Sequence, residues 1–387
     1  MFQVLEINTI KELRSFKLAW NELSSRSRSK RFQLSFAWLE AYWEYSGDDR
    51  SLKVLVSTLA SRVIGILPLV TKKTGSRLGS LNTLNYPLDG WGSWYGPIGP
   101  NSAATLTSCM RHLSTSLDGW DLLDLSYTDR DRLDLGRTVT AARNIGWKAL
   151  ERTWEQIPYI QMKDSWDEFL NTKNESEINR ILENEAELTA SGKVVLHHYR
   201  SDQETSSELS QQLQSWKEIV KSQTSTNNTQ ALQEFPLIKC MAEAADDEGQ
   251  LDMAVLSLDG QPVAATLGFV HDHGVEIVKS VTAKSQPAAI ESVLLGRLLE
   301  QGHVLGDESF EVCEKCSLAQ TARKLWATKL LNSYRYSCAP MRNIRGSMLL
   351  KYHSITGPRV SQKRQSEPLH QQTARVHKTP EMNSHTS

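Results

Sequence analysis

Three short apolar runs lie close together in the stretch LSLDGQPVAATLGFVHDHGVEIVKSV, residues 256–281. An Asp-Gly pair at 259–260 joins the first two runs. This pair suits the two-residue hairpin turn in which both central positions have positive φ. Apolar residues alternate along the second run, as in a strand with one buried face. The pattern predicts a three-stranded antiparallel meander, with Val275, Ile277 and Val281 sharing one face of its third strand.

The same succession of elements is predicted twice along the chain. Helices come first, then an antiparallel hairpin or meander, and then a helix, a strand and a helix. The length also suits two domains. We therefore expect a mixed α/β (α+β) protein with domains at residues 1–153 and 154–355, each with a mostly antiparallel central sheet flanked by helices. Residues 356–387 contain almost no large apolar side chain and are predicted to be a disordered tail.

Composition narrows the class of partner. The net charge of the 387-residue chain is -1, which gives no general reason to expect nucleic acid or an anionic membrane surface. A small molecule or another protein is the expected partner. The longest apolar stretch, Val63–Val70, is far shorter than the roughly 20 residues of a membrane helix, and the first residues do not resemble a signal peptide. Five scattered cysteines favour a reducing compartment, so we expect a cytoplasmic protein.

A helix is predicted to follow the meander at once. The polar residues TAKSQ lead into AAIESVLLGRLLEQG, so the helix is expected to start near Ser285 and Pro287. The first turn of a helix has free N–H groups and a positive dipole end, which suit a pyrophosphate. The small side chains of Ala288 and Ala289 would let such a ligand approach the backbone.

Several segments together carry a family resemblance. They are FQLSFAWLEAYWEYSG, LKVLVSTLASRVIGILPLVTKK, PYIQMKDSWDEFLNT and SLDGQPVAATLGFVHDHGVEIVKSV, and their order and spacing extend over roughly residues 3–350. The chain resembles the GNAT-related acetyltransferases of the CelD/BioF-like group, relatives of the FemAB peptidyltransferases. The resemblance implies two tandem GNAT-like domains and acyl transfer from acetyl-CoA or another acyl-CoA to an amine. It also implies a link to extracellular polysaccharide or cell-envelope biosynthesis.

The chain departs from the family pattern at three places. The loop SQPAAIES lacks the glycine usual before the cofactor helix, residues 173–193 are acidic where the family is basic, and the block SFEVCEKCSLAQTARKLW lacks its glycine. Two alternatives therefore stay open. One is transfer of an aminoacyl group from a charged tRNA, which the neutral charge and the acidic helix disfavour. The other is a non-catalytic binding module that has kept the fold.

Candidate site residues follow from the resemblance and the strand pattern. Glu276 points away from Val275 and Ile277 and is the candidate general base, the alternative being a carboxylate in a salt bridge. Lys279 either meets the phosphates of the cofactor or extends to the edge of the sheet. The cofactor is expected where the strand ends at Val281, and the acceptor in the cleft between the domains.

An aromatic loop supplies candidates for binding the acceptor. Trp91, Trp94 and Tyr95 lie in a glycine-rich segment, where aromatic rings either stack on a sugar or apolar acceptor or fill the interface between the domains. No metal is expected. Cys313-x-x-Cys316 stands without a second pair, and His271-Asp272-His273 falls in a tight turn.

Overall fold

The computed structural model describes residues 2–46, 49–76, 79–116, 119–163, 165–201, 206–222, 229–283, 287–340 and 343–356. Residues 1–357 form one unit by their contacts. The tail predicted for residues 356–387 lies, apart from Thr356, outside the described residues.

The strands of the described residues form one twelve-stranded sheet, in the order β1-β2-β3-β4-β5-β12-β6-β11-β10-β9-β8-β7. Neighbouring strands are antiparallel except in the pairs β4–β5 and β10–β11, which are parallel. The bounds of the strands are β1 Phe2–Ile7, β2 Arg50–Leu59, β3 Arg62–Ser76, β4 Gly79–Asn85, β5 Leu122–Thr128, β6 Leu150–Gln161, β7 Val194–Arg200, β8 Leu251–Leu258, β9 Gln261–His271, β10 Gly274–Thr282, β11 Ser309–Val312 and β12 Lys329–Cys338.

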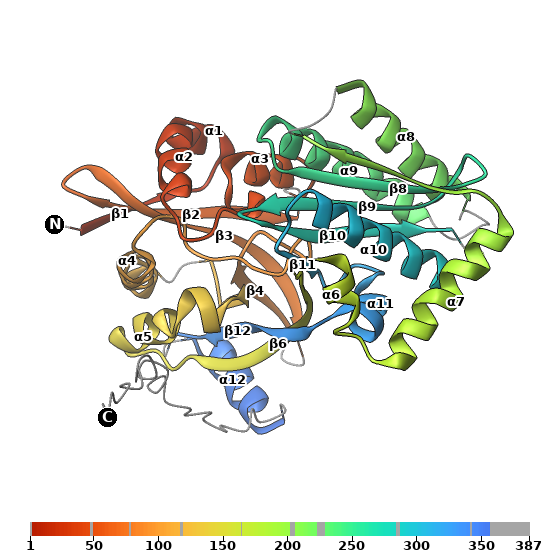
Figure 1. Ribbon diagram of the computed structural model, residues 1–387. Coiled ribbons are helices and arrows are strands. Elements are labelled where there is room, and N and C mark those ends of the chain that lie inside the picture. Colours follow the sequence, from red (N-terminus) through yellow and green to blue (C-terminus); the bar gives the residue numbers. More distant parts are fainter. Residues whose placement is uncertain are drawn as a thin grey trace, which may run out of the picture. The chain divides into compact units, whose positions relative to one another are not determined.

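Helices cover both faces of the sheet (Figure 1). In the C-terminal half, α8 and α9 pack on one face of β8 to β10, while α7 and α10 pack on the other. The bounds of the α-helices are α1 Ile10–Leu13, α2 Lys17–Ser25, α3 Phe36–Ser46, α4 Ser102–Thr115, α5 Arg137–Asn144, α6 Trp166–Leu170, α7 Glu175–Ser191, α8 Ser206–Ser222, α9 Thr229–Asp247, α10 Pro287–Val304, α11 Ala319–Thr321 and α12 Ile344–Thr356. The acidic helix α7 begins with a capping box formed by Asn174 and Glu177.

The two halves repeat one strand pattern, as the sequence predicts. An antiparallel run, β1 to β4 or β7 to β10, is followed by a strand parallel to its last member, β5 or β11. The last strand of each half pairs with the other half. The strand β6, which ends the N-terminal half, pairs with β11, and β12, which ends the C-terminal half, pairs with β5. The boundary expected at 153/154 falls inside β6, and the division into two domains stays a prediction.

The predicted meander is confirmed as β8 to β10, with positive φ angles of 48° at Asp259 and 78° at Gly260. The face assigned to Val281 is wrong. The register of β10 against β9 shifts between Ile277 and Lys279, which marks a β-bulge. An extra residue reverses the alternation of side chains beyond it. Val275 and Ile277 therefore pack in one apolar cluster and Val281 in the other.

Candidate functional site

A buried arginine joins the two halves of the chain. Arg31 precedes the short 3₁₀ turn Phe32–Leu34 and lies between two adjacent strands of the C-terminal half. Its Nη1 is 2.9 Å from Oε2 of Glu276 on β10, and its Nη2 is 2.8 Å from Oε2 of Glu311 on β11. The side chains are 7%, 0% and 2% exposed, so the three charges are almost shielded from water. Buried charges of this kind persist in proteins when they are paired.

Further donors engage both carboxylates. Glu276 accepts hydrogen bonds from the Gln33 amide at 3.0 Å and from the Ser93 backbone N–H at 2.5 Å. Glu311 accepts one from the Trp94 indole at 2.7 Å, and Arg132 lies 3.2 Å from it. Neither carboxylate depends on a ligand for its hydrogen bonds. We call Arg31, Glu276, Glu311 and Arg132 the ion network.

Electrostatics keep this network charged. Burial alone would raise the pKa of the Glu311 carboxyl. The charges of Arg31 and Arg132 lower this pKa by more than burial raises it, so the net shift is downward. Burial alone would lower the pKa of Arg31, but Glu311 and Glu276 raise it above its ordinary value. Glu311 and Arg31 are therefore both charged at neutral pH.

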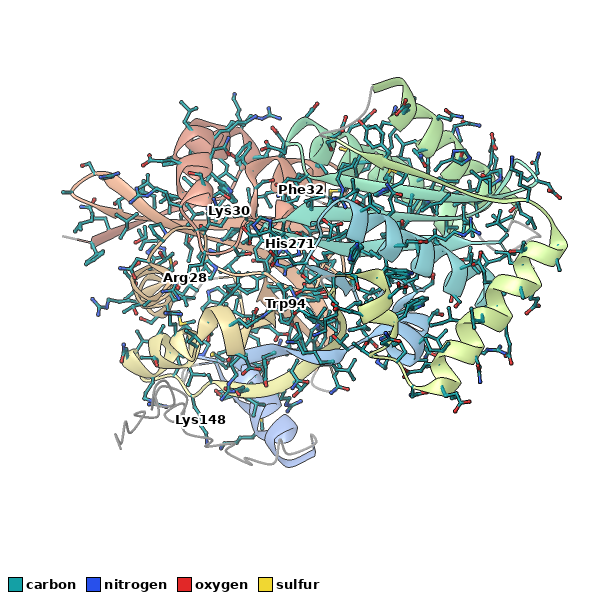
Figure 2. All side chains as sticks on the ribbon, in the orientation of Figure 1. Arg28, Lys30, Phe32, Trp94, Lys148 and His271 are labelled. Atoms are coloured by element: carbon teal, nitrogen blue, oxygen red, sulfur yellow. The ribbon has the colours of Figure 1, made fainter. Side chains whose placement is uncertain are left out.

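Two adjacent cavities border the network, and we call them the first and second cavity. The first measures about 70 Å³ and the second about 250 Å³. Their linings share Arg28, Ser29, Arg31, Asp129 and Leu133, all from the N-terminal half. The second cavity is also lined by residues of the other half, among them Tyr159, His271, Gly274 and Glu311. Figure 2 shows Arg28, Trp94 and His271 in the middle of the view, where these linings lie.

His271, the last residue of β9, is a candidate that sequence reasoning missed, because it weighed this histidine only as a metal ligand. It lines the second cavity, and its Nε2 is buried without a hydrogen-bond partner. Burial, followed by the charge of Arg31, lowers the pKa of His271 to about 3. The imidazole is therefore neutral at pH 7, and a neutral imidazole has one nitrogen that can accept a hydrogen bond. Its place at a strand end beside a tight turn was the signal in the sequence.

The aromatic loop is buried. Trp91, Trp94 and Tyr95 are 4%, 2% and 4% exposed. Trp94 and Tyr95 line the first cavity, and the bond from Trp94 to Glu311 crosses between the halves. Trp91 does not line either cavity, and its ring lies under Lys279 at 4.5 Å from Nζ. These contacts favour the interpretation that the loop fills the interface between the two halves. Two of its residues, Trp94 and Tyr95, also line the first cavity.

The residues predicted to bind the cofactor are dispersed. Lys279 forms an ion pair with Glu234 of α9 at 2.6 Å, so it points away from the start of α10. Ala288 is exposed in the first turn of α10, whereas Ala289 and Val281 are buried. Ser285 lies outside the described residues.

The parallel pairing of β10 with β11 ends at Ile277 and Val312. The segment after β11 then packs against the second part of β10. The Oγ of Ser280 lies 2.6 Å from the Oγ of Ser317 and 3.0 Å from the Sγ of Cys316. Side chains of the protein thus contact the end of β10 where the cofactor is expected.

Other types of site find no support in the described part of the chain. It contains no group of three or more His, Cys, Asp or Glu residues placed to hold a metal ion. Cys313 and Cys316 are buried free thiols, and burial raises the pKa of Cys316 to about 11. Within the same residues, every helix is too short or too polar to cross a membrane.

Comparison with known proteins defines the class. Residues 176–314 match the model of a family described as an acetyltransferase (GNAT) domain. This match, which includes β7 to β11, confirms the GNAT-type fold and the transferase class expected from the sequence. No curated protein sequence matches the chain.

The whole chain is similar in fold to FemX. The TM-score is 0.54 at 9% sequence identity, over 90% of this chain and 99% of FemX. This likeness extends over both halves of the chain and shows a shared fold. Weaker matches are a conserved protein from Bacteroides thetaiotaomicron (TM-score 0.49, 11% identity, 87% of this chain and 100% of that one) and L-PGS from Bacillus licheniformis (0.48, 14%, 83% and 96%).

Proposed function

We propose that the protein is an N-acyltransferase that transfers an acyl group from an acyl-CoA, such as acetyl-CoA, to an amine bound in the two cavities. The observation that carries this proposal is the position of the second cavity. It lies between the halves, against the strands of the GNAT-matching segment, and contains the unpartnered nitrogen of a neutral histidine. Ligand sites form preferentially at such junctions.

The reaction assigns roles to groups that the cavities contain. The amine nitrogen attacks the thioester carbonyl, the new C–N bond forms, and the C–S bond breaks to release CoA as its thiol. The proton that the amine loses passes to the departing thiolate of CoA. We assign to Nε2 of His271, whose low pKa makes it a weak base, a hydrogen bond that orients the amine. Glu276 does not line either cavity and has both oxygens engaged, which supports a positioning role through Arg31.

We place the donor along the second part of β10 and the start of α10, where free N–H groups favour the pyrophosphate. Ala288 offers the clean test, because its side chain is exposed and a larger one does not disturb the core. Ala288→Glu is expected to abolish acetyl-CoA binding in calorimetric titration by placing a negative charge beside the phosphates. Ala289→Glu is unsuitable, because Ala289 is 4% exposed and a glutamate there would disrupt the packing of α10.

The experiment that tests the function measures acetyl transfer from acetyl-CoA to a panel of amines. The free thiol of the released CoA is the quantity detected. His271→Gln is expected to lower turnover with little change in acetyl-CoA affinity, whereas Glu276→Gln is expected to lower turnover and stability together. Absence of binding across several acyl-CoAs, in a folded protein, contradicts the proposal. Retention of charged tRNA that weakens with salt would instead assign the donor to aminoacyl-tRNA.

A further inference from the structure

Three hydroxyl groups in the first cavity lack hydrogen-bond partners. They belong to Tyr86, Tyr95 and Thr128, which line the cavity and are 3%, 4% and 4% exposed. A buried hydroxyl without a partner costs about 1 to 3 kcal/mol. Three such groups on residues that line one small cavity are therefore a cost that a polar ligand able to reach them would remove.

The fold brings these hydroxyls together from separate segments. The parallel pairing of β4 and β5 ends at Asn85 and Asp124, and the two strands then diverge. Tyr86 follows the first strand directly, Thr128 ends the second, and the Tyr95 backbone N–H bonds to the carbonyl of Tyr127 between them. Ligands of α/β proteins bind in the crevice outside the carboxyl ends of such strands.

A carboxylate adds to this set of groups. Asp134 lines the same cavity and is 8% exposed. It accepts hydrogen bonds from the Thr138 and Gly136 backbone N–H groups at 3.0 and 3.1 Å and from the Thr138 hydroxyl at 2.6 Å. The ion pairs found among the described residues do not include it, in contrast to Asp129, which pairs with Arg132 at 2.7 Å. Asp134 thus offers lone pairs to O–H donors, and the three hydroxyls both donate and accept.

We infer that the two adjoining cavities together bind an amino sugar, with ring hydroxyls directed into the first cavity and the amino group in the second cavity toward His271. This inference rests on the proposed function and names the class of acceptor. Sugar hydroxyls complement the hydroxyls of Tyr86, Tyr95 and Thr128 and the carboxylate of Asp134. A simple alkylamine would leave the three hydroxyls unpaired, and a neutral sugar would bring no nucleophile to His271.

The test compares three probes on the full chain: glucosamine, glucose and hexylamine. Glucosamine is expected to bind in calorimetric titration without any acyl donor and to be the best acceptor with acetyl-CoA. Glucose is expected to bind but not react, and hexylamine to bind at least about tenfold more weakly, which corresponds to one or two hydrogen bonds.

Matched variants separate recognition from stability. Tyr95→Phe and Thr128→Val each remove one unpartnered hydroxyl and are expected to weaken glucosamine binding about three- to tenfold, while the midpoint of thermal unfolding stays or rises. Tyr336→Phe and Thr266→Val are the controls, because those hydroxyls are also buried and unpartnered but do not line either cavity. The controls are expected to leave binding unchanged.

The outcomes distinguish this inference from the proposed function. Equal binding of hexylamine and glucosamine, or equal effects of cavity and control variants, overturns the amino-sugar inference. Acetylation of other amines but not of glucosamine, galactosamine or mannosamine also overturns it and leaves the proposed function standing. Binding of glucosamine that depends on Tyr95, without transfer from any acyl-CoA, supports the sugar site and rejects the function.

Discussion

The ion network and the first cavity share a wall, since Arg31 belongs to both, yet their polar groups are satisfied to different degrees. In the network, Glu276 and Glu311 of the C-terminal half each receive several donors from the N-terminal half of the chain. In the cavity, the hydroxyls of Tyr86, Tyr95 and Thr128 receive none. The two regions are both buried and differ only in whether the protein itself supplies the partners.

The difference separates a structural role from a binding role. Buried charges that are fully engaged hold the two halves in one arrangement and leave nothing for a ligand to add. Buried hydroxyls without partners lower stability and gain hydrogen bonds when a ligand enters. We therefore assign cohesion of the halves to the network and recognition of the acceptor to the cavity.

The largest effect is expected from breaking the network. Glu276→Ala removes a fully buried partner of Arg31, and an uncompensated buried charge costs about 3 to 5 kcal/mol. Urea unfolding should show this loss of unfolding free energy. The control is Glu22→Ala, whose carboxylate pairs with Arg26 and Arg62 on the surface and contributes about 0 to 1 kcal/mol. Equal losses of unfolding free energy in the two variants would contradict a structural role for the network.

A buried group outside both regions gives a second test. Glu155 on β6 is 8% exposed, and its Oε2 has no partner, but it lines neither cavity. Burial raises the pKa of Glu155 to about 7 from an ordinary value of 4.5. The folded protein therefore retains a proton that the unfolded chain releases, and stability falls as pH rises from 4.5 to 7.

Glu155→Gln removes this penalty. We expect the variant to be more stable than the parent by about 3 kcal/mol at pH 8 and nearly equal at pH 4. Thermal unfolding at the two pH values checks the difference, and acceptor binding should not change. A variant that is less stable at pH 8 would show that the carboxylate has a favourable partner when ionised.

Local patterns in the sequence predicted much of the fold. The Asp259-Gly260 turn and the alternation on either side of it define the meander, because both act over a few residues. The β-bulge in β10 escaped prediction, since an extra residue is visible only against the partner strand. The exchange of β6 and β12 escaped for the same reason, because pairing between distant strands leaves no local pattern.

The candidate site was predicted less well. Glu276 was found from its strand position, but its partner Arg31 lies 245 residues away, and nothing around Arg31 indicates burial. The hydroxyls of the first cavity are ordinary Tyr and Thr residues in the sequence. Only the folded chain shows that they lack partners, since that property depends on every neighbouring segment.

The smallest effect is expected at the cavity histidine. The pKa of His271 is about 3 in the folded protein, against about 6.5 for the ordinary side chain. The unfolded chain therefore binds a proton first as pH falls through 6.5, and the folded protein loses stability between pH 6.5 and 3. His271→Gln keeps a neutral polar side chain and should reduce the loss between pH 7 and 5 by about 2 kcal/mol.

Thermal unfolding at pH 7 and 5 measures this effect, with the exposed His197→Gln as control. An equal response of the two variants would mean that His271 exchanges protons freely with solvent. Its neutral nitrogen would then be no special feature of the cavity, and the contrast between the ion network and the unpartnered cavity groups would rest on the hydroxyls alone. A response confined to His271→Gln instead supports a neutral acceptor nitrogen beside the charges of the network.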